Sequence, residues 1–183
     1  MRLRIEDLKE GELTFQFEEK QAAFPVLMEM VADGECEILT PVRVKGSTLQ
    51  VQHMIEVSGT VEVRVRLTCS RCLNPFESKL HNAFTLDFTR APLEAEAAPG
   101  PKEAEMRPET VALVIFEGDE IDLREAVQEQ VVLAFPQKPL CRESCKGLCP
   151  TCGFELNQGD CGCRPSAPNS GFAVLKNLKL PPK

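Results

Sequence analysis

The chain has 183 residues and a formal net charge of −7 at pH 7, with 21 Lys and Arg against 28 Asp and Glu. Its hydrophobic content of 43% and charged content of 27% are ordinary for a globular protein with its own core. The acidic balance and the lack of Trp and Tyr argue against a nucleic-acid-binding surface over most of the chain. Its apolar stretches are too short to cross a bilayer, and none follows the basic N-terminus. We therefore expect a cytoplasmic protein without a secretory signal or a membrane span.

The first half of the chain has the period-two hydrophobic pattern of β-strands. One run extends from Cys36 to Val44, residues 45–47 have the composition of a turn, and the alternation resumes from Leu49 to Leu67. After residues 69–72 the pattern returns from Phe76 to Phe88. These runs predict three or four long antiparallel strands in a meander, with Cys36 in the core.

The next segment, residues 91–109, is rich in Ala, Glu and Pro. It has too little apolar surface to offset the entropy of ordering, so we expect a flexible acidic loop. A short strand is expected over 111–116. Asp122 and Glu125 then have the spacing of a capping box, which predicts a helix over about 122–134.

Six of the nine cysteines lie within residues 141–163. Zinc takes four soft ligands in a tetrahedron, and the turn from Cys149 to Cys152 presents two thiolates, with Gly153 free to adopt a positive φ. Cys161 and Cys163 supply a second pair. The polar residues around them offer no core for six thiols, so the pattern predicts zinc. An iron–sulfur cluster is the alternative, but no electron-transfer motif accompanies the cysteines.

A further Cys-x2-Cys motif, Cys69-Ser70-Arg71-Cys72, lies between two predicted strands. By itself it is half of a metal site, a redox pair or a turn with two inert thiols. If one zinc takes the four cysteines from Cys149 onward, Cys141 and Cys145 are left without partners. Cys69 and Cys72 would then complete a second site, which would tie the tail to the sheet.

The predicted fold is α+β: a twisted antiparallel β-sheet or partial barrel, one packed helix and a C-terminal zinc knuckle. We expect a β-rich domain over residues 1–140 and a cysteine-rich segment over residues 141–183. The second segment would hold the knuckle and a short C-terminal helix. The pattern predicts no catalytic set, and it leaves the oligomeric state open.

In combination, these motifs resemble the YceD family, the large ribosomal RNA subunit accumulation proteins of bacteria and plastids. The resemblance rests on Cys69-x-Arg71-Cys72-Leu73, Glu120-Ile121-Asp122-Leu123, Leu140-Cys141-x3-Cys145-Lys146-Gly147-Leu148-Cys149-Pro150-x-Cys152-Gly153, Asn157, Cys161-x-Cys163 and Phe172-x2-Leu175-x2-Leu178. It implies a non-catalytic role in ribosomal RNA processing or accumulation, and hence in ribosome biogenesis.

The acidic composition limits how such a protein would act. It either works through a ribosomal protein or assembly factor with a basic surface, or contacts ribosomal RNA locally through its basic tail. The tail's basic residues are Arg142, Lys146, Arg164, Lys176, Lys179 and Lys183. A competing interpretation is a redox- or metal-responsive regulator that uses the Cys69 and Cys72 pair.

Overall fold

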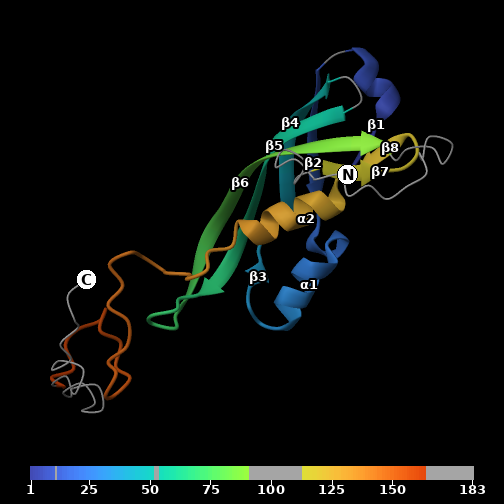
Figure 1. Cartoon of the computed structure of the whole chain (residues 1–183). Helices are drawn as coiled ribbons and strands as arrows, with labels where there is room; N and C mark the ends of the chain where they lie inside the picture. Colours follow the sequence, from blue (N-terminus) through green and yellow to red (C-terminus); the bar gives the residue numbers. More distant parts are fainter. Residues whose placement is uncertain (11, 52–53, 91–112, 164–183) are drawn as a thin grey trace, which may run out of the picture.

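Figure 1 presents a computed structural model, which describes residues 1–10, 12–51, 54–90 and 113–163. In chain order its elements are β1 (Arg2–Arg4), the 3-10 helix η1 (Ile5–Glu10), β2 (Leu13–Glu19), the 3-10 helix η2 (Gln21–Ala23), α1 (Pro25–Ala32), β3 (Glu37–Ile38), β4 (Val42–Val51), β5 (Met54–Thr68), β6 (Pro75–Arg90), β7 (Leu113–Phe116), β8 (Glu120–Asp122) and α2 (Arg124–Leu133). The predicted acidic loop over 91–109 and the predicted C-terminal helix lie outside the described residues.

The main sheet has the order β2-β4-β5-β6-β7, and β3 pairs with the part of β5 that extends past the first residues of β4. The predicted meander is confirmed, because β4, β5 and β6 are consecutive antiparallel neighbours. One part of the prediction is wrong: the sheet is mixed rather than antiparallel, since β7 lies parallel to β6. The strands do not close into a barrel. A separate two-stranded sheet pairs β1 with β8.

The turn expected at residues 45–47 is instead the middle of β4, which is a correction to the sequence interpretation. Gly46 lies opposite Gly59 of β5, and a Cβ atom at Gly46 would clash with the Ser58 backbone oxygen. The glycine is therefore there for a close approach of two strands, which the sequence pattern does not distinguish from a turn.

Among the described residues the structure contains two α-helices, whereas the sequence predicted one helix in this part of the chain. The prediction missed α1, which begins at Pro25 and buries Leu27. The helix expected over 122–134 is α2, but it begins two residues later and has no capping box. Asp122 ends β8 instead, and its carboxylate accepts a hydrogen bond of 3.0 Å from the Arg124 backbone N–H.

The core forms between α2 and the face of β5 and β6 that it covers. The odd-numbered apolar residues of β5 are buried, as the period-two pattern predicted, and so are Leu80 and Phe88 of β6. Cys36 is 7% exposed and belongs to this core, which confirms its prediction. The β5–β6 hairpin continues beyond the helices, and the cysteine-rich tail lies at its far end (Figure 1).

None of the helices in the described ranges is long and apolar enough to span a membrane.

Candidate metal centres

The β5–β6 hairpin ends in a tight turn that holds Cys69 and Cys72. The Cys69 N–H donates to the Asn74 oxygen at 2.9 Å, and the Leu73 N–H donates to the Cys69 oxygen at 2.9 Å. Leu73 has a φ of 60°, a left-handed conformation that is unusual for a residue with a side chain. This turn places two thiols on one side of the hairpin end.

The chain returns to this turn after α2 and pairs with it. The Ser70 N–H donates to the Pro139 oxygen at 2.8 Å, and the Leu148 N–H donates to the Arg71 oxygen at 3.1 Å. The Arg71 guanidinium donates from the same nitrogen to the oxygens of Glu143 (3.0 Å) and Cys145 (2.9 Å). Backbone and side-chain hydrogen bonds therefore hold the tail against the hairpin.

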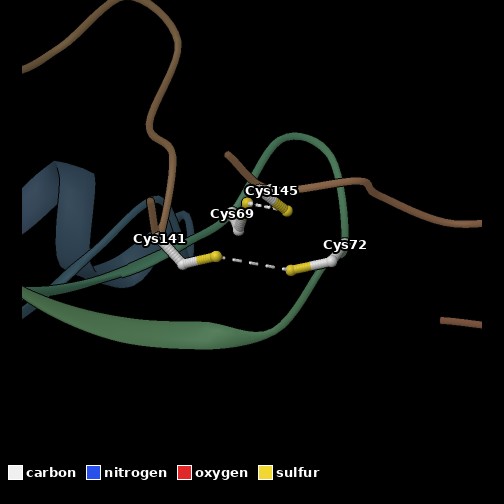
Figure 2. A group of neighbouring side chains, drawn as sticks. All are labelled: Cys69, Cys72, Cys141 and Cys145. Atoms are coloured by element: carbon white, nitrogen blue, oxygen red, sulfur yellow. Dashed lines mark hydrogen bonds between the residues drawn. The ribbon is translucent and has the colours of Figure 1, made fainter. Parts of the chain in front are cut away.

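This pairing brings Cys69 and Cys72 together with Cys141 and Cys145, and we call these four residues the hairpin cluster. Figure 2 shows the four sulfur atoms facing one another, two from the hairpin turn and two from the tail. Cys69 Sγ lies 3.9 Å from Cys145 Sγ, and Cys72 Sγ lies 3.8 Å from Cys141 Sγ. All four atoms lie within 4.8 Å of one another.

A second set, the tail cluster, consists of Cys149, Cys152, Cys161 and Cys163, whose sulfur atoms also lie within 4.8 Å of one another. It is more open than the hairpin cluster, because Cys152 is exposed and Cys161 and Cys163 are half-buried. The structure therefore groups the eight thiols into the two sets that counting partners along the sequence suggested.

The two clusters share one turn structure. The Cys149 N–H donates to the Phe154 oxygen at 2.8 Å, and the Gly153 N–H donates to the Cys149 oxygen at 2.9 Å. These bonds repeat those of Cys69 and Leu73 in the hairpin turn. Gly153 has a φ of 74°, as the sequence predicted, at the position where the hairpin turn has Leu73.

The thiols within each cluster have divergent pKa values. Backbone hydrogen bonds, first from Cys141 and then from Cys72, lower the pKa of Cys69 to about 6. Burial and the neighbouring thiols raise the pKa of Cys141 to about 12. A hydrogen bond from the Asn157 side chain is the largest cause that lowers the pKa of Cys145.

The tail cluster shows the same divergence. Backbone hydrogen bonds from Cys152 and Thr151 lower the pKa of Cys149 to about 6. The neighbouring thiols, Cys152 first, raise the pKa of Cys163 to about 12. Negative charge on one sulfur thus opposes charge on the next, and a bound cation would relieve that repulsion.

The four sulfur atoms of each cluster lie close enough together to ligate a single metal ion. A Zn–S bond of about 2.3 Å implies sulfur–sulfur separations of about 3.8 Å. Two of the separations in the hairpin cluster are 3.8 Å and 3.9 Å. An iron–sulfur cluster with several irons holds its thiolates farther apart, so the spacing is compatible with one metal ion per cluster.

Further residues support the clusters, and sequence reasoning had assigned them no role. Asn157 donates to Cys145 Sγ at 3.3 Å and to the Glu155 carboxylate at 3.3 Å. Asn74, from the hairpin, donates to that carboxylate at 2.9 Å. Its place in the family motif was the one feature of the sequence that pointed to Asn157. Nothing in the sequence indicated a role for Asn74 or Glu155.

The burial of Cys69 and Cys72 bears on the redox interpretation. Their exposed fractions are 0% and 3%, so an oxidant reaches neither sulfur unless the tail separates from the hairpin. A redox role for this pair stays a prediction without support from the geometry.

The fold and the site define a class: an α+β protein whose cysteine-rich tail carries two four-thiol clusters, one of which it shares with the end of a long β-hairpin. Residues 57–179 match the family described as "Large ribosomal RNA subunit accumulation protein YceD". The chain therefore belongs to the YceD family. No solved structure matches it.

Its relatives include proteins of that description from plants and bacteria. The chloroplastic YCED homolog 1 of Zea mays is 27% identical over 158 residues, which are 76% of this chain and 54% of the relative. The YceD protein of Haemophilus influenzae is 28% identical over 155 residues, 83% of this chain and 82% of the relative. An uncharacterized protein of Mycobacterium tuberculosis is 35% identical over 107 residues, 58% of this chain and 47% of the relative. The chain thus spans about half the length of the plant and mycobacterial relatives.

Proposed function

We propose that this chain is a non-catalytic zinc-binding factor that supports the accumulation of large-subunit ribosomal RNA during ribosome biogenesis. The observation that carries the zinc part is the pair of clusters, each with four sulfur atoms within 4.8 Å of one another. The ribosomal part rests on family membership and on the printed names of the plant and Haemophilus relatives.

The donor sets favour structural zinc. Each cluster offers four thiols, and a site with four protein ligands has no open position for a substrate or a reactive water. Cys69, Cys72, Cys141 and Cys145 would hold one ion, and Cys149, Cys152, Cys161 and Cys163 the other. Each ion would neutralise the charge of its thiolates, and the ion in the hairpin cluster would also cross-link the tail to the hairpin.

The carboxylates support a role without catalysis. Within the described part of the chain, each carboxylate with a lowered pKa has a partner that explains it, and for Glu155 the first is the hydrogen bond from Asn74. Lys79 lowers the pKa of Glu62, and Arg124 lowers the pKa of Asp122. These are surface ion pairs rather than groups poised for proton transfer.

An acidic groove favours a protein partner over direct RNA contact. It has a volume of about 630 Å³ and lies between β7 and α2, with Phe88 and Val114 at its apolar side. Its acidic lining residues are Glu117, Glu120, Asp122, Glu125 and Glu129. Glu120 pairs with Arg2 and Asp122 with Arg124, but the other carboxylates favour a basic, partly apolar segment of a ribosomal protein or assembly factor over phosphate.

The proposed function is tested in cells that lack this protein, by measuring the ratio of large- to small-subunit ribosomal RNA. The wild-type gene should restore the ratio, and a Cys69→Ser/Cys72→Ser gene should not. A Cys36→Ser gene is the matched control, because it also changes a buried thiol but leaves both clusters intact. An unchanged ratio in cells without the protein would overturn the ribosomal role.

A filter-binding assay with large-subunit RNA fragments tests the choice of partner. We expect the chain to bind these RNA fragments weakly. In a separate capture experiment it should retain a basic ribosomal protein, and a Glu125→Lys/Glu129→Lys variant should not. Tight, salt-sensitive RNA binding that disappears when the tail is removed would contradict the protein-partner version.

A further inference from the structure

The loop that closes the tail cluster also contacts the hairpin cluster. Asn157 lies between Cys152 and Cys161, two thiols of the tail cluster. Its side-chain amide nevertheless donates to Cys145 Sγ of the hairpin cluster at 3.3 Å. A residue whose position depends on one cluster is therefore bonded to a sulfur atom of the other.

The orientation of this amide is set by its second bond. The Asn157 side-chain oxygen accepts a hydrogen bond of 2.9 Å from the backbone N–H of Lys146. An amide with its oxygen held in this way must direct its N–H groups to the other side, where Cys145 lies. The contact with sulfur is thus a donor contact, which favours the thiolate that a metal needs.

The same loop is attached to the tail segment that follows Cys145, and at one point to the hairpin. Leu148 pairs with Glu155 in a short antiparallel bridge, and the Leu156 N–H donates to the Gly147 oxygen at 2.9 Å. The Glu155 carboxylate accepts from Asn74 of the hairpin at 2.9 Å. Ordering of this loop therefore places Asn157 and Glu155 together against the hairpin cluster.

We propose that the two clusters bind metal cooperatively, with Asn157 as the positioning residue that couples them. This inference rests on the proposed zinc binding and extends it. An ion in the tail cluster joins Cys149 and Cys152 to Cys161 and Cys163, and so closes the loop that holds Asn157. The Asn157 donor is then already ordered beside the hairpin cluster. Metal binding at the hairpin cluster therefore no longer includes the entropy cost of ordering Asn157.

The coupling is reciprocal, because the factor by which one ion strengthens the other site is the same in both directions. Loss of an outer-shell hydrogen bond typically lowers metal affinity by about ten- to a hundredfold. We therefore expect the coupling factor to be on the order of tenfold.

The test compares binding constants of the full-length metal-free chain, titrated with Zn²⁺ against a chelator of known affinity. In the Cys161→Ser/Cys163→Ser variant the hairpin cluster is the one complete site, and in the Cys69→Ser/Cys72→Ser variant the tail cluster is the one complete site. For the wild-type chain, the product of its two stepwise constants should exceed the product of the two single-site constants by about tenfold. Circular dichroism checks that the sheet is folded in each variant.

The role of Asn157 is tested by repeating the series with Asn157→Asp. This variant keeps the oxygen that accepts from Lys146 but loses the N–H that reaches Cys145. The product of the two stepwise constants should then equal the product of the two single-site constants, so that the excess vanishes. Asn157→Ala should abolish it as well. Gln158→Ala is the matched control: Gln158 is the neighbouring amide and contacts Glu155 rather than a sulfur, so the excess should persist.

Each outcome decides a separate point. Two zinc ions with equal products would overturn the coupling and leave the zinc proposal intact. An excess that survives in the Asn157→Asp and Asn157→Ala series would remove Asn157 as the coupling residue. A chain that binds no zinc would overturn both the coupling and the zinc proposal.

Discussion

The hairpin cluster and the tail cluster use the same ligands and the same turn but differ in what they join. The hairpin cluster joins residues that are 69 and 76 positions apart, and three of its four thiols are buried. The tail cluster lies within residues 149–163, and one of its thiols is exposed. One site is thus part of the tertiary structure, whereas the other is a local knuckle.

Because of this difference, loss of a metal ion should have a different effect at each cluster. An ion in the hairpin cluster would hold the tail on a sheet that already has its own core, so its loss should release the tail without unfolding the sheet. An ion in the tail cluster would replace the core that residues 149–163 lack. The predictions below, from the largest expected effect to the smallest, are ways to break this contrast.

The largest contrast is expected in limited proteolysis with trypsin. Cys69→Ser/Cys72→Ser should free the tail, so that cleavage after Arg142 and Lys146 becomes at least tenfold faster than in the wild-type chain. Cys161→Ser/Cys163→Ser should change cleavage at Arg142 much less, because the hairpin cluster remains. Equal rates at Arg142 in both variants would contradict the assignment of the tie to the hairpin cluster.

Acidification should release metal from both clusters. Zinc binds thiolates, so the metal-free chain binds more protons than the metal-bound chain, and the apparent affinity falls as the pH falls. The pKa values of Cys141 and Cys163 are raised to about 12, so each cluster displaces at least one proton near neutral pH. We expect each site to lose about tenfold or more in affinity per pH unit.

Chelator competition between pH 6 and pH 8 measures this slope in the two single-site variants. Burial should alter the rate of zinc release, which is slower for the hairpin cluster, but not the direction of the slope. An affinity that is independent of pH would contradict thiolate ligation.

Arg71→Ala should weaken the hairpin cluster selectively. The variant loses the two hydrogen bonds to the oxygens of Glu143 and Cys145, and we expect a loss of about five- to tenfold in zinc affinity there. Arg71→Lys should not restore the affinity fully, because an ammonium group lacks the geometry of the guanidinium. In Cys69→Ser/Cys72→Ser, which retains the tail cluster alone, Arg71→Ala should leave zinc affinity unchanged; a comparable loss there would mean a general effect on the tail.

The smallest effect is expected at Gly153. No heavy atom lies within 4 Å of a Cβ built there, so Gly153→Ala introduces no clash and its cost is that of a positive φ. That cost is about 1 kcal/mol, which corresponds to roughly fivefold in affinity at the tail cluster. Leu73→Gly at the equivalent position of the hairpin turn should not weaken the hairpin cluster. Titration of the single-site variants measures both, and a large loss in Leu73→Gly would contradict the equivalence of the two turns.

The sequence predicted what local chemistry determines. The period-two pattern from Ile55 to Phe88 identified the hairpin and its buried face, because alternation of side chains is a property of each strand, but the same pattern wrongly joined Leu49 and Val51 of β4 to this run. The two Cys-x2-Cys motifs and the count of unpaired thiols suggested the grouping of the clusters. The positive φ of Gly153 also follows from the motif itself.

What the sequence did not predict depends on contacts between distant residues. The parallel pairing joins Asp87–Arg90 of β6 to Leu113–Phe116 of β7, which are distant in the sequence, and Gly46 acquires its role only through Gly59 of the neighbouring strand. Asn74 and Glu155 are ordinary polar residues until the tail docks on the hairpin. The division of the chain near residue 140 stays a prediction.

The most direct measurement is the zinc content per chain, by elemental analysis of protein purified without a chelator or a metal-binding tag. We predict two zinc ions in the wild-type chain and one in Cys69→Ser/Cys72→Ser, because that variant removes half of the hairpin cluster and none of the tail cluster. Two ions that persist in the variant, or one ion in both proteins, would contradict a metal site shared between hairpin and tail. No zinc in the wild-type chain would contradict the account of both clusters.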